Sequence, residues 1–127
     1  MVGVSKFGGS SVANSNQFKK VKNIIESNAN RKVVVTSALG KESPDDSKIT
    51  DLLYLLHAHL KYNVPYTSVW NLIKVRYQHV RDNLNIDVDI EKEFDLLESK
   101  LSKEISVDFL VSRGEYLTGI LLSKYLG

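Results

Sequence analysis

Three consecutive valines, Val33 to Val35, constrain the fold of this chain more than any other feature of its sequence. An unbroken β-branched run is typical of a parallel strand that is covered on both faces, so residues 32–36 are predicted to form such a strand. A second run, residues 2–5, stops at Lys6 and is followed by a pair of glycines. It predicts another buried strand that ends in a Gly-Gly turn.

The segment between the two predicted strands has a helical pattern. Polar residues occupy one side, and Asn14 or Ser15 is suited to cap the helix at its start. We expect this helix to end near residues 28–30. Residues 2–36 are therefore predicted to form one βαβ unit of a parallel sheet, whose ligands gather beyond the carboxyl ends of the strands. The inward-facing positions of the helix are Phe18, Val21, Ile24 and Ile25.

The remainder of the chain is predicted to be mainly helical. Residues 40–48 have the polar, proline-containing composition of a surface loop, where we expect weak order. Residues 50–104 are interpreted as a helical insertion beside the sheet, in which Pro65 separates the first two helices and Asp87 or Asp89 opens the third. A fourth helix follows and ends at the C-cap Gly127. The residues expected to face inward are Leu52, Leu53, Leu55, Leu56 and Leu60; Val69, Leu72, Ile73, Tyr77 and Val80; Ile90, Phe94, Leu97 and Leu101; and Leu110, Leu117, Leu121 and Tyr125.

The composition excludes several classes of function. A chain of 127 residues is expected to form one domain, and the absence of cysteine excludes disulfides and thiolate metal sites and fits a cytoplasmic location. A formal charge of +2 is too small to indicate a nucleic-acid or membrane partner. The three histidines are interpreted as surface or packing residues, the acidic residues at 87–93 as a solvated helix start, and Asp45 and Asp46 as polar loop residues, so no metal ligand is predicted.

Residues 6–11 combine the elements of an anion site. Glycines let backbone N–H groups approach phosphate oxygens, the start of the following helix adds partial positive charge, and Lys6 supplies a full one. The order differs from a Walker A loop, in which lysine follows the glycines, and from a dinucleotide fingerprint. On spacing alone, a polyphosphate site and a plain Gly-Gly turn with a solvated Lys6 are equal alternatives.

Small polar residues also follow the valine strand. Thr36, Ser37 and Ala38, with Gly40 close behind, either hold a polar substrate or an oxyanion at the sheet edge or form a simple transition from strand to loop.

The fourth predicted helix contains an irregular segment, residues 112–115, with a glycine and two charges. Glycine inside a helix costs about 1 kcal/mol relative to alanine, which indicates a close approach or a functional contact. The alternative is a helix start with an exposed charge pair. If Glu115 faces the sheet edge, its carboxylate would suit the ammonium group of a substrate.

Three motifs, taken in order, resemble those of aspartate kinases. They are residues 6–13 (KFGGSSVA), residues 33–41 (VVVTSALGK) with 49–53 (ITDLL), and residues 110–115 (LVSRGE). The resemblance runs from residue 2 to the end, but corresponds only to roughly the first third of a typical family member. It identifies residues 1–127 as the N-terminal part of an amino acid kinase domain, without the C-terminal half of that domain and without the regulatory ACT domains. Ser10 stands where the family usually has threonine, which keeps the hydroxyl.

The resemblance implies the amino acid kinase fold, an αβα sandwich around a mainly parallel sheet. It also implies transfer of the ATP γ-phosphoryl group to the side-chain carboxylate of L-aspartate. The product would be 4-phospho-L-aspartate, the entry to lysine, threonine and methionine synthesis. Mg²⁺ would be held mainly through the nucleotide, and the full-length enzyme would be a homo-oligomer.

The same resemblance assigns roles to individual residues. Lys6 would be catalytic, because a lysine offsets the charge that develops during phosphoryl transfer. The ATP phosphates would be bound by Lys6, Gly8, Gly9 and Ser10, and L-aspartate by Ser37, Thr50 and Glu115.

Because much of the kinase has no counterpart here, we expect this chain alone to be inactive or nearly so. The alternative is a lobe derived from an amino acid kinase that binds a ligand or partner without catalysis, for which an exposed apolar sheet edge would be the structural sign. A kinase for another amino acid, such as glutamate, is a weaker alternative, because it should lack the paired Lys-Phe-Gly-Gly and Ser-Arg-Gly-Glu motifs.

Overall fold

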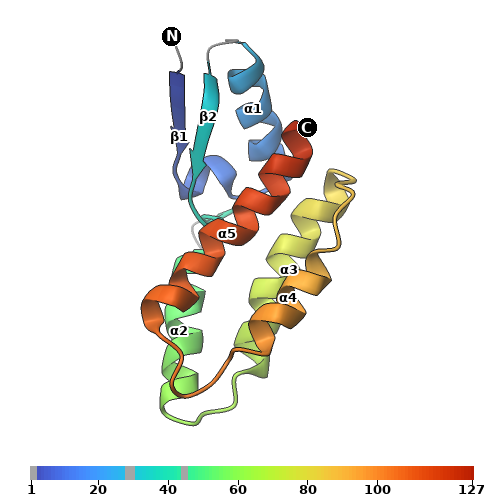
Figure 1. Ribbon diagram of the computed structural model, residues 1–127. Coiled ribbons are helices and arrows are strands. Elements are labelled where there is room, and N and C mark those ends of the chain that lie inside the picture. Colours follow the sequence, from blue (N-terminus) through green and yellow to red (C-terminus); the bar gives the residue numbers. More distant parts are fainter. Residues whose placement is uncertain (1–2, 28–30, 44–45) are drawn as a thin grey trace.

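The computed structural model describes residues 3–27, 31–43 and 46–127, which form an α/β structure with two strands and mostly helices (Figure 1). Strands β1 (Gly3–Phe7) and β2 (Arg31–Thr36) are parallel, and helix α1 (Ser15–Glu26) connects them. The predicted βαβ unit is thereby confirmed. The strand predicted over residues 2–5 extends through Phe7, because Lys6 pairs with Val35 and Phe7 with Thr36.

Helix α1 begins and ends with local hydrogen bonds. Of the two caps that the sequence suggested, Asn14 is the N-cap, and its side-chain oxygen accepts a 3.1 Å hydrogen bond from the N–H of Gln17. The helix ends at Glu26, before the predicted end at residues 28–30, which lie outside the described residues. A short 3-10 helix, η1 (Gly9–Val12), precedes it and was not predicted.

All four later helices are present: α2 (Ile49–Lys61), α3 (Thr67–Asn83), α4 (Ile90–Glu98) and α5 (Val107–Leu126). Pro65 lies between α2 and α3, and Asp89 caps α4 by accepting a hydrogen bond from the N–H of Lys92. Figure 1 shows α2, α3 and α4 gathered beyond one end of the sheet, while α5 runs from that bundle alongside the strands. The predicted helical character of residues 50–104 is therefore confirmed, but its helices lie beyond the end of the sheet, and the helix that runs beside the strands is α5.

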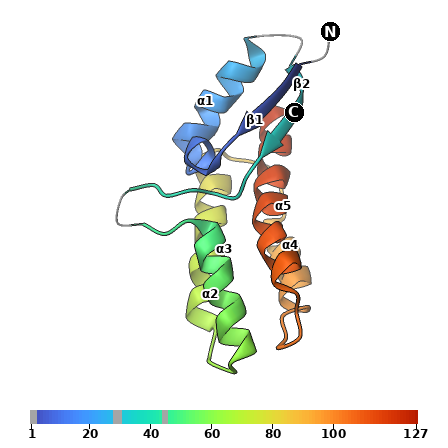
Figure 2. The same cartoon turned by 90° about the vertical axis from the view of Figure 1, so that its left-hand side faces the viewer.

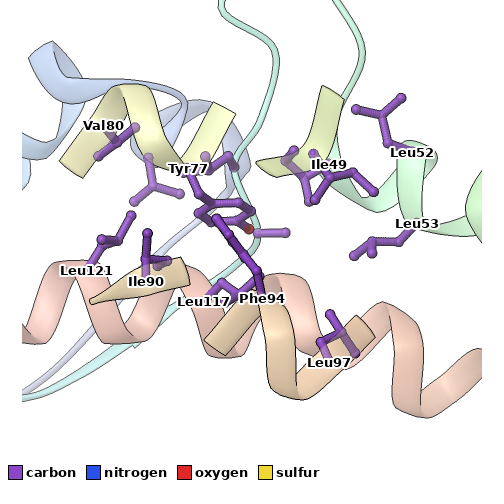
Figure 3. Packing of buried hydrophobic residues seen from close by; sticks show 14 of the residues in the cluster. Ile49, Leu52, Leu53, Tyr77, Val80, Ile90, Phe94, Leu97, Leu117 and Leu121 are labelled. Carbon is purple, nitrogen blue, oxygen red and sulfur yellow. The ribbon is translucent and has the colours of Figure 1, made fainter. Parts of the chain in front are cut away.

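One continuous core joins the βαβ unit to the helices. It extends from Phe7 and Phe18 to the side chains around Tyr77, which lies among residues of α2, α4 and α5 in Figure 3. Most of the predicted inward positions are buried, and Ile25, Leu101 and Tyr125 are partly buried against the core.

Three predicted core positions are wrong. Ile24, Leu55 and Leu72 are 45%, 44% and 57% exposed. Each stands beside another large apolar residue in the chain, and consecutive helical residues point about 100° apart, so only one of them can face the core squarely. The position three or four residues away decides which one does.

One face of the sheet is exposed. Lys6 and Val35 are partners in the register and both are exposed, with Val35 at 44% and Val4 on the same face at 66%. The expectation that the valine strand is covered on both faces is therefore wrong for Val35. The opposite face is covered: Phe7 is buried and Val34 packs against the core.

Within the described residues, no helix combines the length and the apolar character that a membrane crossing requires.

Candidate functional site

The loops that follow β1 and β2 meet at the carboxyl ends of the two strands. The N–H of Gly40 donates a 2.9 Å hydrogen bond to the carbonyl oxygen of Gly9, and the N–H of Ser37 donates to the carbonyl oxygen of Phe7 at 3.2 Å. A Cβ atom on Gly40 would lie 2.4 Å from the carbonyl carbon of Gly9. Glycine is required at position 40 because the two backbones touch there.

A cleft of about 480 Å³ opens beside this contact. That volume is within the range of small-molecule sites. Two lysines and several hydroxyl and backbone groups line it, and no carboxylate belongs to the lining among the residues that the structure describes. Because Thr50 belongs to the first turn of α2, the partial positive charge of that helix start also faces this region. The cleft therefore favours an anionic ligand. Its lining residues are Gly9, Ser10, Ser37, Ala38, Leu39, Gly40, Lys41, Lys48 and Thr50.

Four of the residues selected from the sequence lie together in this lining: Gly9, Ser10, Ser37 and Thr50. They come from three separate segments, namely the turn after β1, the loop after β2 and the start of α2.

The other three selected residues do not line the cleft. Lys6 is exposed on β1, on the uncovered face of the sheet. Gly8 is exposed, and a Cβ atom there would meet no other atom within 4 Å. Glu115 is exposed on α5.

The neighbour of Glu115 connects α5 to the cleft. Gly114 is buried in the middle of α5, where a Cβ atom would lie 2.7 Å from the Cβ of Ala38 and 3.1 Å from Cδ1 of Leu53. The close-approach interpretation of this glycine is confirmed, and the alternative of a helix start is wrong. Through Ala38, α5 supports the wall of the cleft from behind.

Tyr77 of α3 lies beneath this contact and was not selected from the sequence as a site residue. Its hydroxyl donates a 2.8 Å hydrogen bond to the carbonyl oxygen of Gly114 and is 3.1 Å from Oγ1 of Thr118. Burial raises the pKa of Tyr77, against smaller opposing effects of its hydrogen bonds to Thr118 and Leu39 and of the Arg76 charge. The phenol therefore stays neutral and joins α3 to α5.

Sequence reasoning also missed Lys41 and Lys48. Both lie at the ends of the polar segment between β2 and α2, and residues 37–43 run outward from the end of β2 in Figure 2. The available signal was their position: basic residues close to the carboxyl end of a parallel strand lie at the edge where ligands gather.

No three His, Asp or Glu side chains in the described ranges come close enough together to hold a metal ion. Asp45, which the sequence analysis assigned to loop polarity, lies outside those ranges. Asp46 is bound to protein groups: it accepts hydrogen bonds from the N–H groups of Glu42 and Ser47 and pairs with Arg76 at 3.1 Å.

No protein-family model matches this chain. The chain is 33% identical over 128 residues to aspartokinase 3 of Bacillus subtilis, an alignment that covers 96% of this chain and 28% of that relative. Its structure is similar to that of Clostridium acetobutylicum aspartate kinase, with a TM-score of 0.93 and 52% identity over 97% of this chain and 28% of the other.

Two structures of Escherichia coli aspartokinase III are also similar. One was solved with aspartate and ADP and gives a TM-score of 0.78 at 27% identity; the other was solved with lysine and aspartate and gives 0.78 at 28%. This chain covers 29% and 28% of those two chains. It therefore spans less than a third of the length of the relatives that it matches. By sequence and by fold, the homologues of this chain are aspartokinases, and it corresponds to a part of them.

Proposed function

We propose that this chain is the part of an aspartokinase that forms a cleft for ATP phosphates and L-aspartate. The reaction is the ATP-dependent phosphorylation of the side-chain carboxylate of L-aspartate to 4-phospho-L-aspartate. The observation that carries the proposal is the meeting of Gly9 and Ser10 with Ser37 and Thr50 in one cleft, in a chain whose homologues are aspartokinases. One of the similar structures contains aspartate and ADP.

The phosphate-binding side of the cleft is the turn after β1. Backbone N–H groups at Gly9 and Ser10 and the charges of Lys41 and Lys48 provide an environment that stabilises phosphate oxygens. Lys6 and Gly8 precede this turn, so in the proposal the Lys6 side chain reaches the transferred phosphoryl group from β1. Phosphoryl transfer depends mainly on positioning and on stabilisation of developing charge, and lysines and backbone donors supply both.

Magnesium fits this proposal only through the nucleotide. Mg²⁺ prefers oxygen ligands, especially carboxylates and phosphates, and the described part of the cleft lining offers hydroxyl and backbone oxygens but no carboxylate. The phosphates would therefore carry the ion, where it neutralises part of their charge. The residues of this chain would bind and orient the resulting complex.

The aspartate-binding side is formed by Ser37 and Thr50, whose hydroxyl groups can bind a carboxylate of the substrate. Glu115 would complete this side from α5 by pairing with the substrate ammonium group. Its neighbour Gly114 is held against Ala38, which itself lines the cleft. The backbone next to Glu115 is thereby anchored to the wall of the cleft.

The complete enzyme would also contain the rest of the amino acid kinase domain. An αβα sandwich needs strands and helices beyond the two strands described here, and the exposed valines on one face of β1 and β2 are consistent with a further layer that covers this face in the complete domain. The same valines are consistent with a lobe that binds a partner without catalysis. Residues 1–127 are assigned to the N-terminal part of the kinase domain, in a cytoplasmic enzyme, and this part alone is expected to have little or no activity.

The first experiment compares the 127-residue polypeptide with the complete product of its gene. Aspartate-dependent release of ADP from Mg·ATP is measured for both, with L-glutamate as the control substrate. We expect activity with L-aspartate only, and only in a longer gene product. Robust phosphorylation by the 127-residue polypeptide would refute the expected inactivity. Absence of activity in both the polypeptide and the complete gene product would refute the proposed kinase activity.

The second experiment tests the assigned residues by ligand titration of the 127-residue polypeptide, followed by NMR. Mg·ADP is expected to shift the amide signals of Gly9 and Ser10, and L-aspartate those of Ser37 and Thr50. In an active gene product, Lys6→Ala is expected to lower kcat by about 100-fold or more. If turnover and ATP affinity were unchanged, Lys6 would be a solvated surface residue.

A further inference from the structure

One arginine behind the cleft contacts all the segments that form its walls. Arg76 extends from α3, and its side chain is 12% exposed. One terminal nitrogen donates to the carbonyl oxygens of Ala13, at 3.2 Å, and of Gly40. The other donates to the carbonyl oxygen of Ser47 at 3.0 Å and pairs with the carboxylate of Asp46 at 3.1 Å.

These four acceptors belong to different parts of the site. Ala13 directly follows η1, so a contact with Ala13 fixes the position of the turn after β1. Gly40 lies in the loop after β2 and itself lines the cleft. Asp46 and Ser47 precede Lys48 and Thr50, which also line the cleft. A single guanidinium thus holds the three segments that supply the lining.

The chemistry requires arginine specifically. A guanidinium has five N–H donors in a rigid fork, whereas a lysine ammonium has three donors around a single point. Three backbone carbonyls and one carboxylate cannot all be satisfied by lysine at these separated positions. Because Arg76 is mostly buried, loss of its side chain would leave carbonyl oxygens of partly buried backbone without a donor.

We infer that Arg76 is a positioning residue, which holds the turn after β1, the loop after β2 and the start of α2 in the register that forms the cleft. It is not among the described residues that line the cleft, so it acts through the segments that it contacts. The part of this inference that concerns ligand affinity rests on the proposed function. The part that concerns the loops does not, because it depends only on contacts within the chain.

The test uses the 127-residue polypeptide with three substitutions. Arg76→Met removes all four contacts at similar side-chain length. Arg76→Lys keeps the charge next to Asp46 but not the fork. The matched control is Arg81→Met, which removes another partly buried arginine of α3 that pairs with Asp82 and Glu91, away from the cleft.

The ligand-free readout is amide hydrogen exchange. The N–H of Gly40 donates to Gly9, and those of Glu42 and Ser47 donate to Asp46, so these three amides report the position of the loop. We expect Arg76→Met to accelerate their exchange about tenfold or more, and Arg81→Met to leave it unchanged. Arg76→Lys should restore protection at Glu42 and Ser47 but not at Gly40, a pattern that general destabilisation would not produce.

The second readout is the dissociation constant for Mg·ADP and for L-aspartate, which we expect Arg76→Met to raise about tenfold relative to Arg81→Met. Equal exchange rates and equal affinities in the two methionine variants would overturn the positioning role. If the wild-type chain bound neither ligand, that result would count against the proposed function, and the exchange comparison alone would decide the role of Arg76.

Discussion

The carbonyl oxygen of Gly9 accepts a 2.9 Å hydrogen bond from the N–H of Gly40, and the two glycines pack backbone against backbone. One of them follows β1 and the other follows β2, so this contact joins the turn and the loop into one wall of the cleft. A Cβ atom on Gly40 would overlap the Gly9 carbonyl group, whereas one on Gly9 would lie in tight contact, 3.3 Å from Cα of Gly40. The geometry of the site therefore depends most on the absence of a side chain at Gly40.

Gly40→Ala is expected to destabilise the chain by about 2 kcal/mol, because its Cβ would overlap the carbonyl carbon and oxygen of Gly9. These are backbone atoms, which cannot rotate away as the end of a flexible side chain could. Unfolding in urea can be followed through the fluorescence of Trp70, the single tryptophan, which is buried. Gly8→Ala is the control, because a Cβ there meets nothing within 4 Å. Equal urea midpoints for the two variants would show that the backbones of Gly9 and Gly40 are not in close contact.

Two glycines of α5 are expected to respond oppositely to alanine. Gly119→Ala should stabilise the chain by about 0.5–1 kcal/mol, because a Cβ at Gly119 meets nothing within 4 Å and alanine favours the helix. Gly114→Ala should destabilise it by about 1–3 kcal/mol, because the new Cβ would lie 2.7 Å from that of Ala38. Thermal unfolding of both variants gives the signs directly.

A second substitution separates this clash from a general effect on α5. Ala38→Gly removes the atom that Gly114→Ala would meet, so the double variant should recover part of the lost stability. Recovery should be incomplete, because Cδ1 of Leu53 would still lie 3.1 Å from the new Cβ. Strictly additive effects would mean that the two residues do not interact.

The elements of this fold could be predicted because each has a local cause. The valine run determines β2, Asn14 and Asp89 cap α1 and α4, and Pro65 separates α2 from α3. The strands and helices could therefore be placed to within a few residues. The exposure of Val35 could not be predicted, because it depends on what covers the sheet and not on the strand itself.

The candidate site was predictable only in part, for a related reason. Ser37 follows strand β2, and Thr50 lies in the first turn of α2. These positions place both residues at the ligand edge of a parallel sheet by topology alone. Arg76 and Tyr77 lie in the middle of α3, where nothing in the local pattern separates a charged surface residue or a core aromatic from a support for distant loops. Their roles arise from contacts with residues 29 to 63 positions away in the case of Arg76, and 37 to 41 positions away for Tyr77.

Tyr77→Phe is expected to cost about 1 kcal/mol at neutral pH, because it removes a buried hydroxyl while Thr118 still donates to the carbonyl oxygen of Gly114 at 2.9 Å. Burial raises the pKa of Tyr77 above its usual value of 10.0, so the unfolded chain loses this proton before the folded chain does. The contribution of the hydroxyl is thus fully present below about pH 10 and decreases above it. Urea midpoints of both proteins should converge as the pH rises through that range; a constant difference would argue against a buried neutral phenol.

Asp46 should contribute to stability only while it is ionised. Burial by itself raises the pKa of this carboxyl. Hydrogen bonds from the N–H groups of Glu42 and Ser47, together with the charges of Arg76 and Lys41, outweigh that effect, so the folded-state pKa lies below 3.8. The stabilisation is therefore fully present above the unfolded-state value and is lost as the pH falls through the folded-state value.

The measurement for Asp46 compares urea midpoints of the wild type and Asp46→Asn, using Trp70 fluorescence. The wild type should be the more stable at about pH 6, and its advantage should shrink toward zero as the pH falls below about 4. In an Arg76→Met background the same substitution should have a smaller effect at neutral pH, because the ion pair is already absent. If the effect of Asp46→Asn were the same in both backgrounds, Asp46 would stabilise the loop through its backbone hydrogen bonds alone, and Arg76 would hold the cleft through the three carbonyl oxygens without it.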